Sequence, residues 1–337
     1  MNFKKILITC VILLTAVCAF AKTKIVTTIF PEYDWVKEIL GKNIKDADLT
    51  LLIGNGVDLH SYQPSIQDVA KISTADVFIY VGGESDSWVA DALKNAKNKN
   101  MKVINLLEVL GDKVKEEEVI EGMQVEEEHD EDEDEDHDHH DHEAEGHHHH
   151  HHSSDEEEVE YDEHVWLSVR NAKILCAEIC DVLCDVDSKN AAAYKTNYKA
   201  YAAKLDKLDS DFAMAVKNGN TDALLFGDRF PFRYFVDDYG LRYYAAFVGC
   251  SAETEASFET IIFLANKVDE LSLNNVCQIE SGDGKIARTI IQSSKNKNTK
   301  ILTFDSMQST TTKDVKKGAS YLSIMQKNLD VLKEALK

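Results

Sequence analysis

Apolar runs and amphipathic segments alternate along most of the chain. The runs are rich in β-branched and aromatic residues, as is typical of buried strands, and the segments between them repeat apolar residues at helical spacing. Before residue 116 the pattern predicts strands at residues 24–28, 48–53, 75–81 and 102–105, with helices at 33–41, 65–73 and 88–95. After residue 218 it predicts strands at residues 223–226, 243–248, 275–279 and 300–304, with helices at 232–239, 258–271, 285–293 and 320–336.

This alternation predicts an α/β fold with two lobes, each built around a parallel sheet that is covered by helices on both faces. The second half repeats the architecture of the first half without repeating its sequence. In such sheets, ligands bind in loops at the carboxyl ends of the strands. We therefore expect functional side chains directly after predicted strands.

The segment between the lobes has a different pattern. Residues 165–216 contain neither proline nor glycine, and apolar residues recur at helical spacing throughout. We predict one long, rigid connecting helix over 164–218, with a break near 185–188. Cys176, Cys180 and Cys184 lie on one face of this helix, where apolar packing is favoured over a thiolate metal site.

Residues 116–163 are acidic and rich in histidine. They contain 25 of the 60 acidic residues, no Lys or Arg, and 11 of the 13 histidines. Such a composition predicts a disordered loop, because little apolar surface is available to offset the entropy of ordering. The simpler interpretation is a solvated acidic spacer, but a spacer has no need of clustered imidazoles, which together with carboxylates capture metals such as zinc. The accessory metal ligands that we predict in this loop are His129, His137, His139, His140, His142, His147, His148, His149, His150, His151 and His152.

Charge outside this loop is close to balanced. The formal net charge is −23, and the loop alone contributes about −25, so the rest of the chain carries about +2. No basic patch is evident in the sequence, and we expect no nucleic-acid partner.

The first 21 residues resemble a secretory signal. Lys4 and Lys5 precede an apolar stretch at 6–17 that is too short to span a membrane, and Ala19-Phe20-Ala21 fits a cleavage site. Lipidation at Cys18 is an alternative, and either process places the mature chain in the periplasm or on the extracytoplasmic face. The predicted organisation is a signal peptide (1–21), an N-terminal lobe (22–115), the His/acid loop (116–163), the connecting helix (164–218) and a C-terminal lobe (219–337).

Four residues outside the loop are candidate metal ligands. His60 and His164 are the only histidines outside residues 116–163, and both lie at the ends of predicted elements. Asp228 and Asp305 follow the strands at 223–226 and 300–304, where binding residues are expected. Each residue also has a simpler interpretation. The two histidines could be ordinary surface or core residues, Asp228 could form a salt bridge, and Asp305 could cap a helix or turn.

The chain resembles the cluster A-I solute-binding proteins of zinc and manganese ABC transporters. The resemblance covers the whole mature chain and rests on residues 56–64 (GVDLHSYQP), 75–83 (ADVFIYVGG) and 162–167 (DEHVWL), together with Trp88. Residues 239–241 (YGL), 255–257 (EAS) and 304–306 (FDS) match more loosely. It implies two α/β lobes joined by a long rigid helix, with the metal held in the cleft between the lobes. An association with cell adhesion also occurs in this family.

By this resemblance, His60 and His164 are the two histidine ligands and Asp305 is the last ligand. The third family ligand is a histidine or glutamate after a strand of the C-terminal lobe, and here the chain departs from the family. The stretch reads GDRFPFRY at 227–234, which places Gly227, Asp228 or Arg229 at that position, and Asp228 is our choice. Water, Cys250 or Glu280 are the alternatives.

The resemblance implies an extracytoplasmic receptor that captures Zn²⁺ and delivers it to an ABC-transporter permease with its cytoplasmic ATPase. We expect a monomer and a binding protein rather than an enzyme. Manganese or iron(II) is the alternative cargo, because two histidines with two carboxylates also accept manganese, although the histidine-rich loop favours zinc. An exported metallohydrolase and a metal-buffering or adhesion protein that uses only the loop are the alternatives of other classes. The sequence contains no HExxH helix, nucleophile elbow or phosphate loop that would support a hydrolase.

Overall fold

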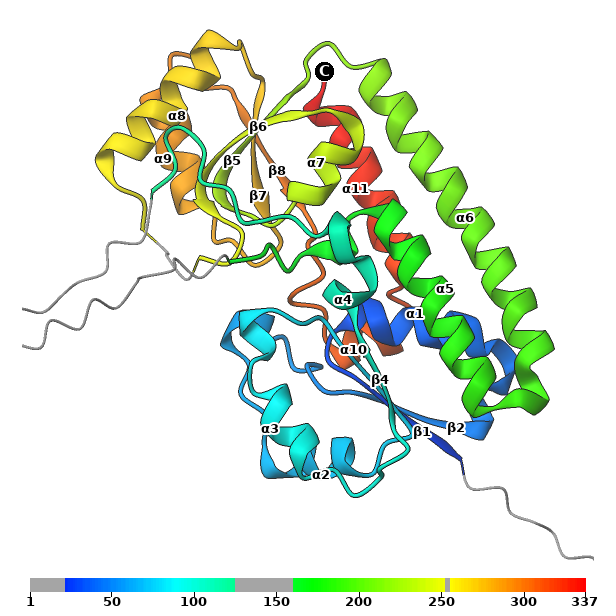
Figure 1. Ribbon diagram of the computed structural model, residues 1–337. Helices are drawn as coiled ribbons and strands as arrows, with labels where there is room; N and C mark the ends of the chain where they lie inside the picture. The colour runs from blue at the N-terminus through cyan, green and yellow to red at the C-terminus, as the bar shows by residue number, and fades with distance from the viewer. Residues whose placement is uncertain (1–21, 125–159, 252–254) are drawn as a thin grey trace, which may run out of the picture.

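The computed structural model describes residues 22–124, 160–251 and 255–337 (Figure 1). The predicted signal peptide and the loop histidines from His129 to His152 lie outside these ranges. The described chain folds into two lobes, each with a four-stranded parallel sheet, and long helices pack along one side of both lobes. Within the described ranges, no helix combines the length and the apolar character needed to cross a membrane.

The N-terminal lobe is close to the arrangement that the pattern predicts. Its sheet has the order β2-β1-β3-β4, all parallel. The strands are β1 (Thr23–Thr27), β2 (Ala47–Leu51), β3 (Val77–Tyr80) and β4 (Lys102–Asn105), and the helices are α1 (Phe30–Leu40), α2 (Ile66–Ser73), α3 (Val89–Lys94) and α4 (Leu106–Leu110). Local sequence sets the boundaries: Ser65 caps α2 by accepting a hydrogen bond from the Asp68 backbone N–H, and Asp68 returns a bond to Ser65.

The C-terminal lobe repeats this topology with the order β6-β5-β7-β8. Its elements are β5 (Ala223–Phe230), β6 (Arg242–Val248), β7 (Asn275–Ile279), β8 (Lys300–Phe304), α7 (Arg233–Tyr239), α8 (Phe258–Glu270), α9 (Lys285–Ser293), α10 (Thr312–Lys316) and α11 (Tyr321–Ala335). Strand β5 continues beyond the predicted end at Phe226, through a register shift between Phe226 and Arg229. The polar Gly-Asp-Arg stretch that indicated a loop is therefore the last part of a strand.

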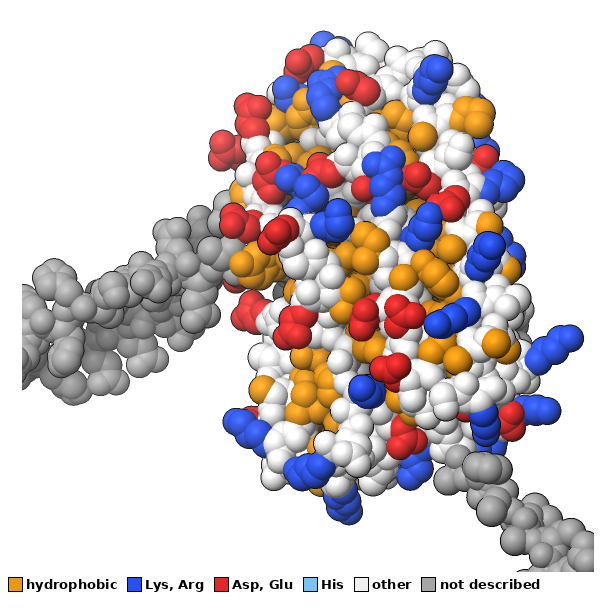
Figure 2. Space-filling view, turned by 45° about the vertical axis from the view of Figure 1, so that its right-hand side comes forward, with side chains coloured by type: hydrophobic (Ala, Val, Ile, Leu, Met, Phe, Trp, Pro, Cys, Tyr) orange, Lys and Arg blue, Asp and Glu red, His pale blue; other side chains and the backbone are white. Residues whose placement is uncertain are grey.

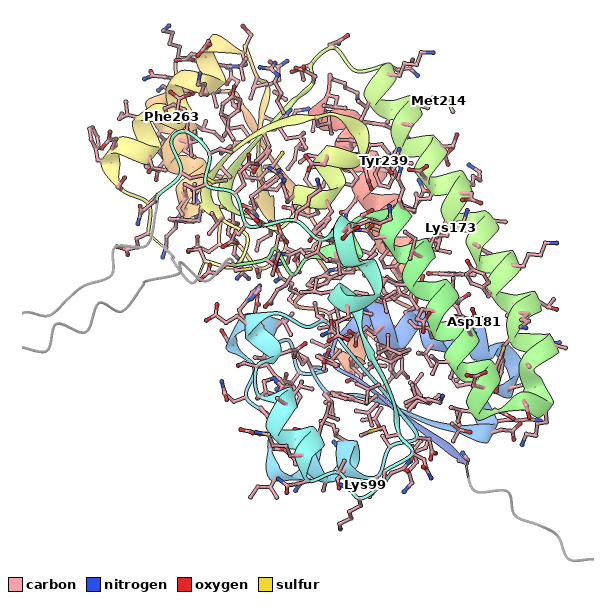
Figure 3. The ribbon with its side chains drawn as sticks, viewed as in Figure 1. Lys99, Lys173, Asp181, Met214, Tyr239 and Phe263 are labelled. Carbon is pink, nitrogen blue, oxygen red and sulfur yellow. The ribbon has the colours of Figure 1, made fainter. Side chains whose placement is uncertain are left out.

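The predicted connecting helix is a helical hairpin. Helix α5 (Val169–Val186) ends where the break was predicted, a 3₁₀ turn follows at Ser188–Asn190, and α6 (Ala191–Lys217) runs back beside α5 (Figure 1). Asp187 fixes the reversal by accepting hydrogen bonds from Asn190 and from the Tyr194 hydroxyl, both at 2.7 Å. Lys173 extends from α5 towards α6 in Figure 3 and pairs with Asp206 there. Only α6 runs the length of both lobes, where it packs against α1 and α11.

One hydrophobic core extends through both lobes. It contains side chains from α1, α5, α6, β5 and α11, and the three cysteines of α5 are buried members of it. All five cysteines of the described chain are free. Tyr321 joins the parts, because its hydroxyl donates to the Trp166 carbonyl at 2.8 Å and its backbone N–H donates to the Asp34 carboxylate at 2.8 Å. The lobes are therefore parts of one packed unit.

The described ends of the acidic segment belong to the folded body, although residues 116–163 were predicted to be disordered as a whole. Glu116 and Tyr161 form an antiparallel bridge, and the Gln124 backbone N–H donates to the Ala246 carbonyl of β6. Gly122, at φ 86°, lies so close to the Phe263 ring that any side chain there would overlap it. We refer to residues 115–124 and 160–163 as the two stems. In Figure 2, acidic and basic side chains are interspersed over the visible face of the described body.

We predict that Phe226→Ala lowers the free energy of unfolding by about 3–5 kcal/mol, because it removes a fully buried ring from the core of the C-terminal lobe. The rings of Phe230, Phe232 and Phe304 surround it, with centroids 5.1–5.6 Å away. Phe258→Ala is the matched control, since that side chain is 81% exposed and its loss should change stability by less than about 0.5 kcal/mol. Urea unfolding followed by circular dichroism measures both, and equal losses would contradict the packing described.

Candidate metal centre

His60 lies in the loop after β2. The 3₁₀ turn Leu59–Ser61 holds it: Asp58 caps the turn by accepting a hydrogen bond from the His60 backbone N–H at 3.1 Å, and Leu59 anchors the turn in the core. The ring Nδ1 of His60 lies 2.8 Å from the Ser85 hydroxyl and 3.5 Å from a carboxylate oxygen of Glu163. These contacts fix the ring with its Nε2 atom towards the interlobe region.

His164 directly follows the second stem, before the 3₁₀ turn at Val165–Leu167 that leads into α5, and is completely buried. Asp162 Oδ1 lies 2.8 Å from the backbone nitrogen of His164 and 2.9 Å from its ring Nδ1, so one carboxylate orients both backbone and ring. The β6 loop passes close to this ring at Gly249, where a Cβ atom would lie 3.0 Å from His164 Cε1. A glycine at this position lets the C-terminal lobe approach the imidazole.

Glu163 ties the two histidine segments together. Its carboxylate accepts a hydrogen bond from the Ser85 backbone N–H at 2.8 Å and lies over Gly83, where a side chain would collide with it. Gly83 has a φ of 81°, which favours glycine. Gly83, the last residue of the 75–83 motif, thus makes room for a buried carboxylate that lies beside His60.

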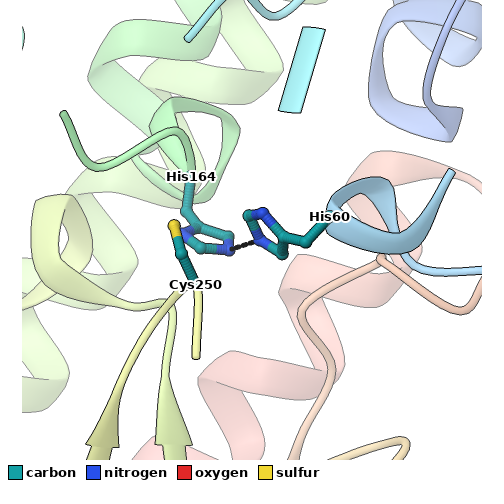
Figure 4. Close-up of side chains that lie close together, drawn as sticks. All are labelled: His60, His164 and Cys250. Atoms are coloured by element: carbon teal, nitrogen blue, oxygen red, sulfur yellow. Dashed lines mark hydrogen bonds between the residues drawn. The ribbon is translucent and has the colours of Figure 1, made fainter. Parts of the chain in front are cut away.

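The two imidazoles meet across 104 positions of sequence, with 3.1 Å between their Nε2 atoms (Figure 4). The Cys250 side chain joins them, and its sulfur and one ring nitrogen of each histidine lie within 4.8 Å of one another. Two nitrogen ligands of one tetrahedral zinc ion are roughly 3.3 Å apart, given a zinc–nitrogen distance of about 2.0–2.1 Å. The spacing of the histidines therefore fits a shared ion.

The partners of the imidazoles also set their tautomers. Asp162 accepts from His164 Nδ1, which places the proton of that ring on Nδ1 and leaves a lone pair on Nε2, and the Ser85 hydroxyl and Glu163 face the Nδ1 atom of His60 in the same way, so that a proton on Nδ1 there directs the His60 Nε2 lone pair to the same side. Both Nε2 lone pairs then point at the same region, where a cation can accept both. Carboxylates in this arrangement orient metal-ligating histidines and strengthen their bond to the metal.

Gln308 contacts both imidazole rings. Its side-chain amide lies 3.3 Å from His60 Nε2 and 3.0 Å from His164 Nε2. The loop after β8 carries it, and Glu280 holds this loop through hydrogen bonds from Ser306 and Ser309. The Trp166 indole N–H donates to the Ser306 carbonyl at 2.9 Å, which couples the loop to the start of α5.

Burial dominates the electrostatics of the site. It lowers the pKa of His60 to about 3, with the neighbouring His164 contributing, so this imidazole is neutral and able to bind a metal at ordinary pH. Burial also raises the pKa of the Glu163 carboxyl. The pKa of the Cys250 thiol lies well above its usual range because of burial and the nearby Glu117 carboxylate. Burial works to raise the pKa of Asp58, but Arg229 and His60 outweigh it and hold this pKa below its usual value.

The two aspartates predicted as ligands lie apart from this group. The Asp228 carboxylate accepts hydrogen bonds from the backbone N–H groups of Arg229 and Ile279, which directs it towards the end of β7. The Asp305 carboxylate accepts the Met307 backbone N–H at 2.9 Å, and burial together with Glu280 raises its pKa to about 6. Among the described residues, neither aspartate belongs to the cluster of ligand atoms formed with His60 and His164.

Arg229 takes a role that the sequence did not predict. Its guanidinium forms an ion pair with the Asp58 carboxylate and so joins the end of β5 to the His60 loop across the lobes. A positive charge is therefore fixed directly beside Asp228, near the end of β5.

A cleft of about 880 Å³ opens beside the site. Both stems of the acidic segment border it. Its lining includes His60, Trp88, Glu117, Glu160, Tyr161, Glu163 and Cys250.

Sequence reasoning placed His60 and His164 in one site but did not assign their supports, Asp162, Glu163 and Ser85, or the contact with Gln308. Cys250 was only an alternative. It follows strand β6, and the strand-end rule that selected Asp228 and Asp305 applies to it equally. The carboxylates next to His164 were visible in the motif, but their roles depend on contacts that form only in the folded chain.

Known proteins similar to this chain bind zinc, according to their names. The chain is 31% identical over 316 residues to the zinc-binding lipoprotein AdcA of Streptococcus pneumoniae strain R6, a match that covers 94% of this chain and 56% of the relative. It therefore spans little more than half the length of that relative. It is also 29% identical over 336 residues to the high-affinity zinc uptake system protein ZnuA of Bacillus subtilis, covering 96% of this chain and 94% of that protein.

The fold and the family agree with these relatives. The crystal structure of the Zn(II)-bound ZnuA-like domain of Streptococcus pneumoniae AdcA superposes with a TM-score of 0.67 and 26% identity, covering 94% of this chain and 99% of that domain. The family model described as zinc-uptake complex component A, periplasmic, matches residues 25–335. With nearly the whole described chain matched, this protein belongs to the zinc-uptake complex component A family, ZnuA.

Proposed function

We propose that this protein is an extracytoplasmic receptor that binds Zn²⁺ between its lobes and delivers it to an ABC-transporter permease and its ATPase. The observation that carries the proposal is the meeting of His60 and His164, with 3.1 Å between their Nε2 atoms and a carboxylate behind each ring. Neutral imidazoles with oriented lone pairs are zinc ligands. Family membership and the zinc-binding relatives support the same cargo.

In this proposal the tight site consists of His60 and His164 with a third donor from the C-terminal lobe. Asp228 and Asp305, both predicted from strand ends, support the loops around the site through their backbone hydrogen bonds. Manganese or iron(II) is the alternative cargo, and competition between Zn²⁺ and Mn²⁺ for the purified protein distinguishes them.

The histidine-rich segment acts as an accessory collector. The stems on either side of it border the cleft beside His60, which supports transfer of captured ions to the tight site. The segment thus raises the local zinc concentration without forming part of the permanent ligand set.

Delivery to a permease is tested in the organism that encodes the protein. Deletion of the gene should raise the zinc concentration needed for growth, and the wild-type gene should restore growth in zinc-poor medium. A gene carrying His60→Ala should not. Growth that is indifferent to the deletion would contradict the receptor function, and turnover of ester or peptide substrates by the purified protein would favour a hydrolase.

We predict that His60→Ala and His164→Ala each lower the affinity of the tight site for Zn²⁺ by more than about 100-fold, because each removes a ligand where even a supporting group typically contributes 10–100-fold. His147→Ala, which removes one of the eleven histidines of the acidic segment, is the control and should leave the tight affinity unchanged. Competition with a chromophoric chelator measures all three. Equal effects of the three substitutions would refute the assignment.

We predict that replacing residues 125–159 by a short Gly/Ser linker eliminates several weak zinc-binding sites and leaves one tight site. The stems at 115–124 and 160–163 are retained because they are part of the folded body. Isothermal titration with Zn²⁺ gives the number of equivalents before and after the deletion. Loss of the tight equivalent on deletion would show that the segment itself is the site.

Because burial lowers the pKa of His60, the free energy of unfolding should depend on pH. The folded pKa of about 3 lies below the unfolded value of about 6.5, so the unfolded chain binds an extra proton between these values. The free energy of unfolding should therefore fall as the pH drops below about 6.5, with His60 contributing roughly 2 kcal/mol of the loss by pH 5. His60→Gln should lose correspondingly less stability between pH 7 and pH 5 in metal-free urea titrations, and an identical loss would contradict the buried, neutral imidazole.

A further inference from the structure

The C-terminal lobe brings one metal-binding side chain to the histidine pair. Cys250 lies two residues after the end of β6, in a loop whose path past His164 depends on the close approach at Gly249. Its sulfur and the two histidine nitrogens lie within 4.8 Å of one another (Figure 4). The side chain also borders the cleft beside the site, so an ion in the cleft reaches it directly.

The carboxylates at the neighbouring strand ends are held by other partners, and Glu280 after β7 accepts hydrogen bonds from Ser306 and Ser309. The chain contains no histidine after His164. At the end of β5, Asp228 is held by the Ile279 backbone N–H, and Arg229 is paired with Asp58. At the end of β8, Asp305 is turned to the Met307 backbone N–H. Of the His, Cys, Asp and Glu side chains that the structure describes, only Cys250 joins the two histidines in a cluster of ligand atoms.

The loop is positioned independently of any ion. The Cys250 backbone N–H donates to the Glu117 carboxylate at 3.1 Å, and Glu117 belongs to the first stem of the acidic segment. The stem in turn pairs with the second stem through the Glu116–Tyr161 bridge, directly before Asp162 and His164. The cysteine loop and the His164 segment are therefore held to the same short ladder, with Glu117 as a positioning residue.

We propose that the Cys250 thiolate is the third ligand of the metal site and that the resulting His₂Cys set selects zinc over manganese. Sulfur is a soft ligand that favours zinc, whereas manganese prefers carboxylate and water oxygens. The proposed ligand thus follows β6, whereas the resemblance led us to expect a ligand after β5, where Asp228 and Arg229 are held by other partners. Metal binding replaces the S–H bond with an S–metal bond and releases one proton to the cleft. This inference rests on the proposed zinc-binding function.

Cobalt(II) tests the ligand directly, because a thiolate bound to Co²⁺ produces an intense ligand-to-metal charge-transfer absorption in the near ultraviolet that nitrogen and oxygen ligands do not give. The purified protein is used with the histidine-rich segment in place, since residues 125–159 contain no cysteine. We expect the band in the wild type, its loss in Cys250→Ser, and its retention in Cys184→Ser. Cys184 is the matched control because it is a free cysteine on α5, outside the ligand cluster.

Metal competition measures the consequence for selectivity. Cys250→Ser should lower the ratio of Zn²⁺ to Mn²⁺ affinity by at least about 10-fold, because a soft ligand is exchanged for a hard one. Cys250→His keeps a zinc ligand at the same position. It should bind zinc within about 10-fold of the wild type, without the thiolate band, which separates ligand loss from misfolding.

The outcomes distinguish this inference from the proposed function. A wild-type protein with one tight zinc equivalent but no thiolate band overturns the role of Cys250 and leaves the zinc receptor intact. An unchanged Zn²⁺/Mn²⁺ ratio in Cys250→Ser also overturns it. A wild type without any tight zinc equivalent contradicts the proposed function itself.

Discussion

A hydrophobic core shared by both lobes is the constraint on which the rest of the structure depends. Helices α5, α6 and α11 contribute to it beside residues of both sheets, and Tyr321 links α1, the start of α5 and α11 at its centre. Because the core is continuous, the loops at the carboxyl ends of the two sheets are held at a fixed separation. That separation lets side chains from distant parts of the sequence form one small site.

Buried carboxylates position the side chains of the candidate metal site between the lobes. Asp162 orients His164, Glu163 lies against the His60 ring and the Ser85 backbone, and Glu280 holds the loop that carries Gln308. Each carboxylate accepts at least one backbone hydrogen bond, which limits the cost of removing it from water, although one oxygen of Glu163 has no hydrogen-bond partner. The ion pair between Asp58 and Arg229 also connects the two lobes, next to the turn that carries His60. The site is thus preorganised by contacts that do not involve the ion.

The acidic segment and the tight site are physically connected. The stems at 115–124 and 160–163 form a short ladder that borders the cleft and carries Glu117 on one side and Asp162 on the other. One stem positions the cysteine loop and the other ends at His164. The two stems on either side of the histidine-rich segment therefore lie next to the two histidines that we assign to tight binding.

The sequence by itself determined the local features of this protein. Hydrophobic periodicity located the strands and most helices, and β4, β7 and β8 match their predicted bounds, because strand burial leaves a direct trace in residue type. The motifs around His60 and His164 likewise located the two imidazoles that meet. Periodicity does not record direction, so the reversal at Asp187 turned a predicted single helix into a hairpin. Only the tertiary structure decided which strand-end side chain lies beside the histidines: Asp228, Asp305 and Cys250 all follow strands, and their positions depend on backbone hydrogen bonds and strand register that link residues far apart in the chain.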